Sequence, residues 1–325
     1  MRKTTKLRIL IWSIALVVAV IMLIISNATY ENPNKTTIFV KAPETMVSAF
    51  ERAFDKLKLD KDYIIEAVTD EKMANFVVRE GITQEGDLIA YSPFVAVFNP
   101  LEEYYKQLSE EEILVKSATD GDYNDLDFLK VVNMAIEGKD CRFKIYYPSK
   151  DSDSWEEFYS FMLLTVNDGY YPTEATELEK SKSKVEKFLS TKYAEPFNNN
   201  TLQRSNGIPK DSIYIMAYSD LVRVYKQIGG FNCRIIYPMT TVYHSYYATY
   251  DELGKMIYDC LGTPIENLSI STKGIGYSYL REYGYNTRNS MYVCSVGTGP
   301  RQYFNAVEIP GAEVFKDMEE ANSYE

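Results

Sequence analysis

The chain has 325 residues, of which 46% are hydrophobic, and this is enough apolar material for one or two folded units. Its formal net charge of −11 argues against DNA or RNA as a partner, because phosphate binding requires a basic surface. Small anions remain compatible with this charge, since helix N-termini bind them without net positive charge. The 28 tyrosines suit the binding of polar molecules, because the ring packs while the hydroxyl forms hydrogen bonds.

The four cysteines contain no CxxC pair, so the sequence supports neither a zinc site nor a redox motif. Each lies in or beside an apolar run, which favours buried free thiols, and export would also permit one or two disulfides. His244 is the only histidine, and it is the single candidate base for a nucleophile–base pair. We therefore expect no metal and no cofactor. The cysteines are Cys141, Cys233, Cys260 and Cys294.

Residues 9–25 form an apolar run that only Ser13 interrupts, and residues 1–8 carry four basic side chains. A membrane-spanning helix needs about 17–25 residues, whereas the apolar part of a signal peptide has about 7–15. Because basic residues stay on the cytoplasmic side, we expect a single-pass protein of the cell membrane whose C-terminal domain is extracytoplasmic. Residues 26–35 are expected to be a linker. The alternative is a secreted protein, cleaved near Ala28.

Strand and helix patterns alternate after this linker. Branched residues at 36–40 predict a strand, and apolar residues at helical spacing over 46–57 predict a helix. This alternation is typical of a parallel sheet covered by helices. The expected elements that follow are a strand at 63–68, a helix at 71–79, and extended runs at 87–92 and 93–98.

A second unit of the same kind follows an acidic stretch at 101–138 that is predicted to be helical. Two α/β units on one chain are therefore expected. Its predicted strands are 141–147, 213–218 and 234–237, and its predicted helices are 155–166, 180–189 and 219–224. An extended segment at 242–250 and helices at 251–261 and 273–285 are predicted after it.

Polar residues follow the predicted strands at their carboxyl ends, where open α/β sheets bind ligands. A hydroxyl or carboxylate just before a helix caps it, and the free N–H groups behind it can bind a polar group. Five such strand ends on two units can face one cleft. The candidate ligand-binding residues are Pro43, Glu44, Thr45, Tyr91, Ser92, Ser149, Ser152, Asp153, Ser154, Ser219, Thr240, Thr241 and Tyr243.

Four stretches resemble type 2 extracytoplasmic solute-binding proteins, the receptors of ABC importers. They are Gly86–Val95, Ile145–Trp155, Ile213–Ser219 and Gly276–Tyr285. The resemblance implies an α/β, two-lobed, type 2 periplasmic-binding-protein-like fold with two mixed sheets, flanking helices and a hinge of two segments. Such proteins close their lobes around a ligand.

The resemblance assigns residues 36–98 and 242–325 to lobe I and residues 99–241 to lobe II, with hinge segments near Asn99 and Tyr243. It implies capture of a small polar solute in the cleft between the lobes, with an ABC permease as the membrane partner. One departure is that the chain lacks the cysteine that carries the lipid anchor of such receptors in single-membrane bacteria.

The charge of the expected cleft bears on the ligand. Basic residues are few there, and acidic neighbours would repel a strong anion, which weakens the oxyanion interpretation. A cation-bearing, zwitterionic or sugar-like ligand remains open. The basic residues are Lys41, Lys150 and Arg223, and the acidic ones are Glu44, Asp151, Asp153 and Asp220.

Two other classes of function are considered. A tethered domain of this fold can serve as a sensor or scaffold without a transport role, which the missing lipid anchor fits. An enzyme would need a nucleophile–base arrangement, and neither His244 nor the pair Asp151 and Asp153 has an evident partner in sequence. The segment Asp120–Asn124 begins like a calcium loop but continues without its later ligands. We expect a binding protein and not an enzyme.

Overall fold

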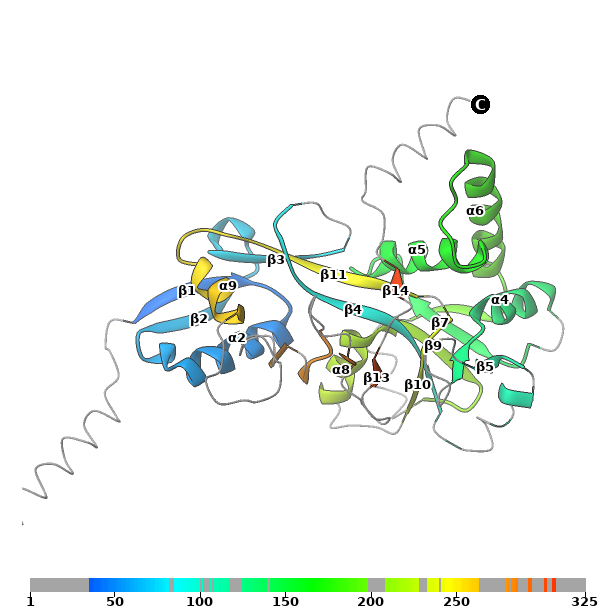
Figure 1. Cartoon of the computed structure of the whole chain (residues 1–325), viewed down its shortest axis with the longest axis horizontal. Coiled ribbons are helices and arrows are strands. Elements are labelled where there is room, and N and C mark those ends of the chain that lie inside the picture. Colours follow the sequence, from blue (N-terminus) through cyan, green and yellow to red (C-terminus); the bar gives the residue numbers. More distant parts are fainter. Residues whose placement is uncertain are drawn as a thin grey trace, which may run out of the picture.

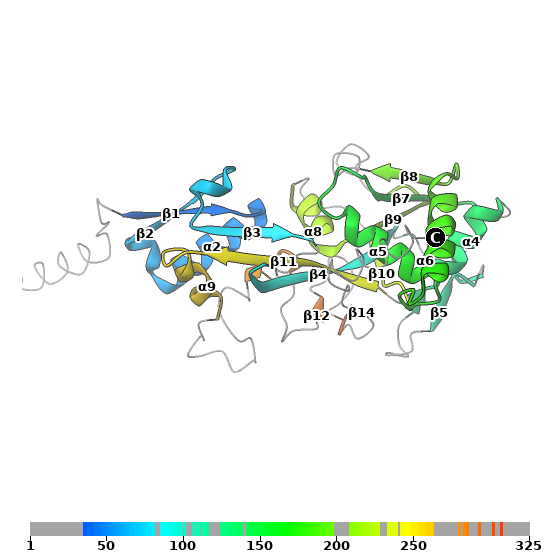
Figure 2. The same ribbon diagram turned by 90° about the horizontal axis from the view of Figure 1, so that it is seen from above.

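Two lobes share a pair of long strands, β4 (Asp87–Phe98) and β11 (Thr241–Tyr250), which run side by side between them in Figures 1 and 2. The names lobe I and lobe II are used for the residue ranges given above, and this division of the chain stays a prediction. The computed structural model describes residues 35–81, 85–99, 101, 106, 108–110, 112–116, 124–138, 141–197, 208–227, 233–239, 241–262, 279–280, 282–285, 292–293, 301–302 and 306–307.

The sheet of lobe I has the order β2-β1-β3-β11-β4. Strand β1 pairs in parallel with β2 and β3, whereas β11 is antiparallel to both β3 and β4. Its remaining elements are β1 (Thr36–Lys41), β2 (Tyr63–Ala67), β3 (Phe76–Glu80), α2 (Glu44–Leu57), α9 (Lys255–Gly262) and the 3₁₀ turns η1 (Leu59–Lys61) and η2 (Glu71–Met73).

The core of lobe I lies between its sheet and helix α2. The apolar residues of α2 recur at helical spacing, so they share one face, and Phe50 packs edge-on against Phe76 of β3 at 5.6 Å between ring centres. The helix ends where Lys58 adopts the left-handed conformation at φ 60°. This packing holds the carboxyl end of β3, and with it Glu80, in place.

The sheet of lobe II continues from β4 through β9, β7 and β8, and β10 pairs with β4 on the side of β11. Strands β9, β7 and β8 run parallel, and β4 is antiparallel to β9. The elements of lobe II are β5 (Leu114–Lys116), β6 (Asn124–Leu126), α4 (Phe128–Glu137), β7 (Lys144–Pro148), α5 (Trp155–Val166), α6 (Ala175–Leu189), β8 (Ala194–Phe197), β9 (Ser212–Ala217), α8 (Tyr218–Gln227) and β10 (Arg234–Ile236). Three short strands follow β11 in the chain and are not part of lobe II: β12 (Tyr292–Val293), β13 (Arg301–Gln302) and β14 (Ala306–Val307).

Both faces of the lobe II sheet are buried. Successive side chains of a strand point to opposite faces, so Phe94 and Phe98 of β4 join the core under α4, α5 and α6, whereas Val95 and Val97 join the core under α8. Strand β9 divides its residues in the same way. This explains why these strands are continuous apolar runs in the sequence.

Two predictions of secondary structure are wrong. Residues 71–79 are not a helix, because only the 3₁₀ turn η2 forms and Phe76–Glu80 is a strand. Branched residues there pair with β1 on one side and β11 on the other, and this sheet pairing overrides the helical pattern. The stretch predicted to be helical over 101–138 is only partly so: residues 106, 108–110 and Phe128–Glu137 are helical, but β5 and β6 form an antiparallel pair between them.

The runs 87–92 and 93–98 are one strand, β4, which changes partner at Pro93. Residues before this point pair with β11, and from Phe94 onward they pair with β9. Pro93 lies opposite Tyr243, so its missing N–H falls where the ladder changes partner. The two mixed sheets of the prediction are therefore joined by β4, and the lobe boundaries near Asn99 and Tyr243 stay a prediction.

Three of the cysteines are buried free thiols, as predicted: Cys141, Cys233 and Cys260. Burial raises the pKa of Cys233 and of Cys260 to about 12, so both thiols stay protonated and act as small apolar side chains. Cys294 lies outside the described residues.

No helix among the described residues has both the length and the apolar character that a membrane crossing requires. The predicted anchor at 9–25 lies outside these residues.

Candidate functional site

A cleft of about 400 Å³ lies where the two lobes meet. Lobe I contributes Glu80, the last residue of β3, and lobe II contributes the segments that follow β7, β8 and β9. These three parallel strands end on the same side of their sheet, which is where open α/β sheets bind ligands. The lining residues are Glu80, Pro148, Ser149, Asp151, Ser152, Asp153, Ser154, Phe197, Asp220 and Arg223.

The turn between β7 and α5 forms one wall of the cleft. The Ser152 hydroxyl and the Ser152 backbone N–H both donate to the carbonyl of Ser149, at 2.8 and 3.0 Å. Ser154 precedes α5, yet its side chain forms no capping hydrogen bond, and its hydroxyl lies 3.5 Å from that of Ser152. This separation exceeds the usual O–H···O range of about 2.5–3.0 Å. Ser154, a residue that is 5% exposed, thus lines the cleft with only this long contact for its hydroxyl.

The start of α8 forms a second wall. The Arg223 guanidinium donates to the carboxylate of Asp220, one turn away on the same helix. Burial raises the pKa of Asp220 above its ordinary value, and the nearby carboxylates of Glu80 and Asp153 act in the same direction, whereas Arg223 and His244 partly counter them. A positive charge placed in the cleft would therefore stabilise ionised Asp220.

His244 joins the two lobes behind this cleft. Its Nδ1 lies 2.9 Å from Oε1 of Glu157 in α5, and its Nε2 lies 2.9 Å from Oε2 of Glu80 in β3. The ring of Tyr246 packs edge-on against the imidazole of His244, with 4.7 Å between the ring centres. His244 and Glu157 are almost fully buried, whereas the Glu80 side chain is 21% exposed and reaches the cleft.

Two charged partners keep His244 protonated. Burial alone would lower the pKa of His244, but the Coulomb attraction of Glu157 and the hydrogen bonds to Glu157 and Glu80 raise it well above its ordinary value. The imidazolium then donates both of its N–H groups. Oε2 of Glu157 is buried and has no hydrogen-bond partner among the described residues. The cluster is thus an ion pair that depends on His244.

Ser92 and Ser219, both predicted to bind ligand, contact each other instead of lining the cleft. The Ser92 hydroxyl accepts from the Ser219 backbone N–H at 2.7 Å and donates to the Gly284 carbonyl at 3.2 Å. The Ser219 hydroxyl lies 2.9 Å from the Tyr246 hydroxyl. Gly284 has φ 85°, and an added Cβ would lie 3.0 Å from the Ser219 Cα, so a side chain does not fit there.

Replacing Ser92 with alanine should lower the free energy of unfolding by about 1–3 kcal/mol, because the buried N–H of Ser219 would lose its acceptor. Urea denaturation of wild type and variant measures the difference as a change in midpoint at constant slope. The control is Ser183→Ala, an exposed position on α6, which should leave the midpoint nearly unchanged. Equal midpoints for all three proteins would show that the contact between Ser92 and Ser219 adds nothing to stability.

The other predicted residues are placed as follows. Pro43 precedes α2, Glu44 is exposed in its first turn, and the Thr45 hydroxyl lies 2.6 Å from that of Tyr285. Tyr91 is buried in β4. None of these four lines the cleft, whereas Ser149, Ser152, Asp153 and Ser154 all do. Thr240 and the side chains of Thr241 and Tyr243 lie outside the described part of the chain, and ligand contact by any of these residues stays a prediction.

Sequence reasoning does not select six of the lining residues as ligand contacts: Glu80, Pro148, Asp151, Phe197, Asp220 and Arg223. Asp151, Asp220 and Arg223 enter it only as charged neighbours of the expected cleft. The sequence pattern does not identify Glu80 as a site residue, because residues 71–79 are predicted to be helical. In the structure Glu80 is instead the last residue of strand β3. Placing polar residues after β3, as was done for the other strands, would have found it.

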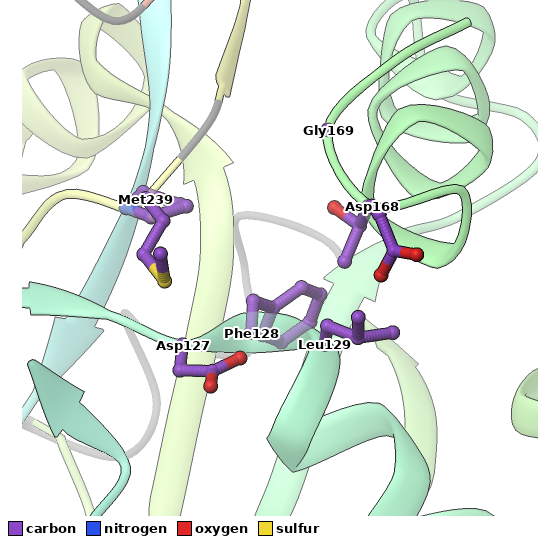
Figure 3. Close-up of a pocket in the computed structure, with 8 residues that line it drawn as sticks. Asp127, Phe128, Leu129, Asp168, Gly169 and Met239 are labelled. Carbon is purple, nitrogen blue, oxygen red and sulfur yellow. The ribbon is translucent and has the colours of Figure 1, made fainter.

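A second hollow, of about 200 Å³, lies on lobe II alone and is shown in Figure 3. It is bounded by Asp127 and Phe128 at the start of α4, by Asp168 and Gly169 after α5, and by Met239. Asp127 accepts a hydrogen bond from the backbone N–H of Lys130, so its carboxylate caps α4. None of the residues that line this hollow belongs to lobe I, and the Asp127 carboxylate is already bound to the backbone of α4.

The described residues contain no group of three or more His, Cys, Asp or Glu side chains that could hold a metal ion. In the cluster at His244 the two carboxylates lie on opposite sides of the imidazole ring and not around a common point. The segment Asp120–Tyr123 of the calcium-loop alternative lies outside the described residues.

Comparison with known proteins identifies the fold. No family model and no curated protein matches the sequence. Among solved structures, the chain is similar to one from Bordetella parapertussis assigned to the extracellular solute-binding proteins, with a TM-score of 0.54, 12% identity, and 87% of this chain and 96% of that chain covered. It is also similar to an ABC substrate-binding protein from Listeria monocytogenes in complex with cycloalternan, with a TM-score of 0.53, 8% identity, and 90% and 92% covered. The predicted type 2 solute-binding protein fold is thus confirmed.

Proposed function

We propose that this chain is a membrane-tethered, extracytoplasmic solute-binding protein that captures a small polar molecule between its lobes. The observation that carries the proposal is the cleft of about 400 Å³, lined from both lobes at the carboxyl ends of β3, β7 and β8 and at the start of α8. Its volume lies in the usual range for small-molecule sites, about 300–1,000 Å³. The cleft also lies where the fold places ligands.

The cleft suits binding better than catalysis. Both ring nitrogens of His244 are held by carboxylates, so this residue has no free nitrogen to act as a base on a bound molecule. Asp151 and Asp153 are exposed, and neither contacts a serine or cysteine nucleophile in the part of the chain that the structure describes. Serine hydroxyls, carboxylates and the Phe197 ring instead provide hydrogen-bonding and apolar contact surfaces.

Closure of the lobes would follow from bending at the shared strands. Pro93 of β4 lies opposite Tyr243 of β11, at the point where β4 exchanges β11 for β9. A small change of dihedral angles there would move Glu80 relative to the Ser149–Ser154 wall. In this proposal the residues 9–25 anchor the chain, and an ABC permease receives the solute.

Thermal-shift measurements on residues 32–325 test the function, with amino acids, sugars, organic cations and anions as separate classes. A ligand at about 100 times its Kd should add about 2.7 kcal/mol of stability. Asp153→Trp should abolish the shift by filling the cleft, whereas Asp60→Trp, an exposed site outside the cleft, should retain it. If no class raises the melting temperature, the protein is a scaffold and not a solute receptor.

A further inference from the structure

We infer that the solute is an organic cation, carrying an ammonium or guanidinium group. This inference rests on the proposed function and names the chemical class that the cleft recognises. Four carboxylates line the cleft, those of Glu80, Asp151, Asp153 and Asp220, against the single guanidinium of Arg223 among its lining residues. A site of this composition attracts positive charge and repels anions.

The charges behind the cleft do not cancel this excess. The group formed by Glu80, Glu157 and protonated His244 holds two carboxylates and one imidazolium. Arg223 is matched by Asp220, to which it donates. Counting the lining and the residues behind it together, five carboxylates stand against two cationic groups.

The remaining excess is concentrated on the turn before α5. Asp151 and Asp153 are exposed at the wall of the cleft, and neither has an ion-pair or hydrogen-bond partner among the described residues. The basic residues expected near the cleft are engaged elsewhere, since Lys41 pairs with Glu71 and the Lys150 ammonium lies over the Trp155 ring. The two carboxylates are therefore available to a ligand.

Ser154 is an independent sign of a ligand in the same place. Its side chain is more than nine-tenths buried, lines the cleft and does not cap α5, and the partner of its hydroxyl is the Ser152 hydroxyl at 3.5 Å, beyond the usual O–H···O range. Buried hydroxyl groups usually have a well-placed partner. An N–H donor of a bound solute would supply a closer one, beside the carboxylate of Asp153.

An organic cation fits the cleft better than a metal ion. The carboxylates are distributed along its walls, and the described residues contain no cluster that could coordinate a metal. The volume of about 400 Å³ suits a small organic molecule. Phe197, at the end of β8, adds an apolar surface for the carbon skeleton of such a molecule.

The test is isothermal titration calorimetry of the full chain in mild detergent, with four-carbon probes of matched length and different charge. The matched probes are 1,4-diaminobutane, which is cationic, 1,4-butanediol, which is neutral, and succinate, which is anionic. Agmatine and choline are two further cations, and maltose is a neutral sugar. We expect at least one of the three cations to bind, and the diol, succinate and maltose to show no binding. Affinity should fall as salt is raised, because the attraction is electrostatic.

Variants locate the charge. Asp153→Asn should weaken cation binding by about tenfold or more, because it removes a charge-assisted contact and leaves the fold intact. Asp60→Asn removes the same charge from an exposed position outside the cleft and should change nothing. Equal loss in both variants would reduce the effect to the overall negative charge and overturn the inference.

The outcomes separate this inference from the proposed function. Binding of succinate or maltose without binding of any cation would overturn the charge assignment and leave the solute-binding function standing. Absence of binding by every probe, together with no thermal shift in the wider screen, would overturn both.

Discussion

Replacing His244 with leucine is expected to lower the free energy of unfolding by about 3–5 kcal/mol. Leucine removes the only cation that contacts Glu157 among the described residues, and the Glu157 side chain is fully buried. One of its oxygens already lacks a partner, so the loss of His244 would leave a buried carboxylate without compensation. Glu80 would suffer less, because it is partly exposed to water in the cleft.

A double variant separates the buried charge from the loss of packing. His244→Leu combined with Glu157→Leu removes both members of the buried pair, and such replacements are often nearly neutral. Urea denaturation should therefore show a double variant that is more stable than His244→Leu alone. If the double variant is as unstable as the sum of the two single variants, shape and not charge determines the stability of this cluster.

The pH dependence follows from the raised pKa of His244. A group whose pKa is higher in the folded state than in the unfolded state stabilises the fold fully below the unfolded value, about 6.5 for histidine. The stabilisation is then lost as the pH rises toward the folded value, at up to about 1.4 kcal/mol per pH unit. The titratable groups that act on His244 are Glu80, Glu157, Tyr246 and Asp220.

The stability difference between the wild type and the double variant His244→Leu/Glu157→Leu, which also lacks the buried carboxylate, should accordingly shift against the wild type as the pH rises above about 6.5. Denaturation midpoints of both proteins across this range measure it. A difference that stays constant, or shifts in favour of the wild type, would show that His244 is neutral in the folded protein and that the two carboxylates do not hold its proton.

Local signals predicted much of the fold. Helix α5 was expected at 155–166 and has these bounds, because a polar turn precedes an apolar stretch of helical length. Ser149, Ser152, Asp153 and Ser154 were assigned to the ligand site for the same reason; all four line the cleft, and their contact with a ligand stays a prediction. In both cases neighbouring residues contain the whole physical signal.

The ion pairs could not be predicted in this way. His244 lies 87 residues from Glu157 and 164 from Glu80 in the chain, so no spacing rule connects them. Ser92 and Ser219 were expected to meet in one region, and they do, but their hydroxyls bond to protein groups. Strand-end reasoning places a residue near a cleft and does not show whether its side chain is already bound within the protein.

Phe161→Ala is the second large effect, with an expected loss of about 3–5 kcal/mol. Phe161 is fully buried in α5 and stacks on Phe94 of β4 at 6.1 Å and on Phe128 of α4 at 5.5 Å between ring centres. Truncation would leave a cavity among aromatic rings that rigid elements hold apart. Urea midpoints measure the loss, and Tyr170→Ala, at a side chain 76% exposed, is the control that should change little.

This substitution also tests how the core positions the site. Helix α5 carries Phe161 in the lobe II core and Glu157 against His244, and Ser154, which directly precedes the helix, lines the cleft. One rigid element thus joins core packing, the link between the lobes and the wall of the proposed ligand site. Phe161→Leu keeps most of the apolar volume and should lose less stability than alanine. If alanine and leucine lower the midpoint equally, aromatic stacking and not cavity volume holds α5, and with it the cleft wall, in place.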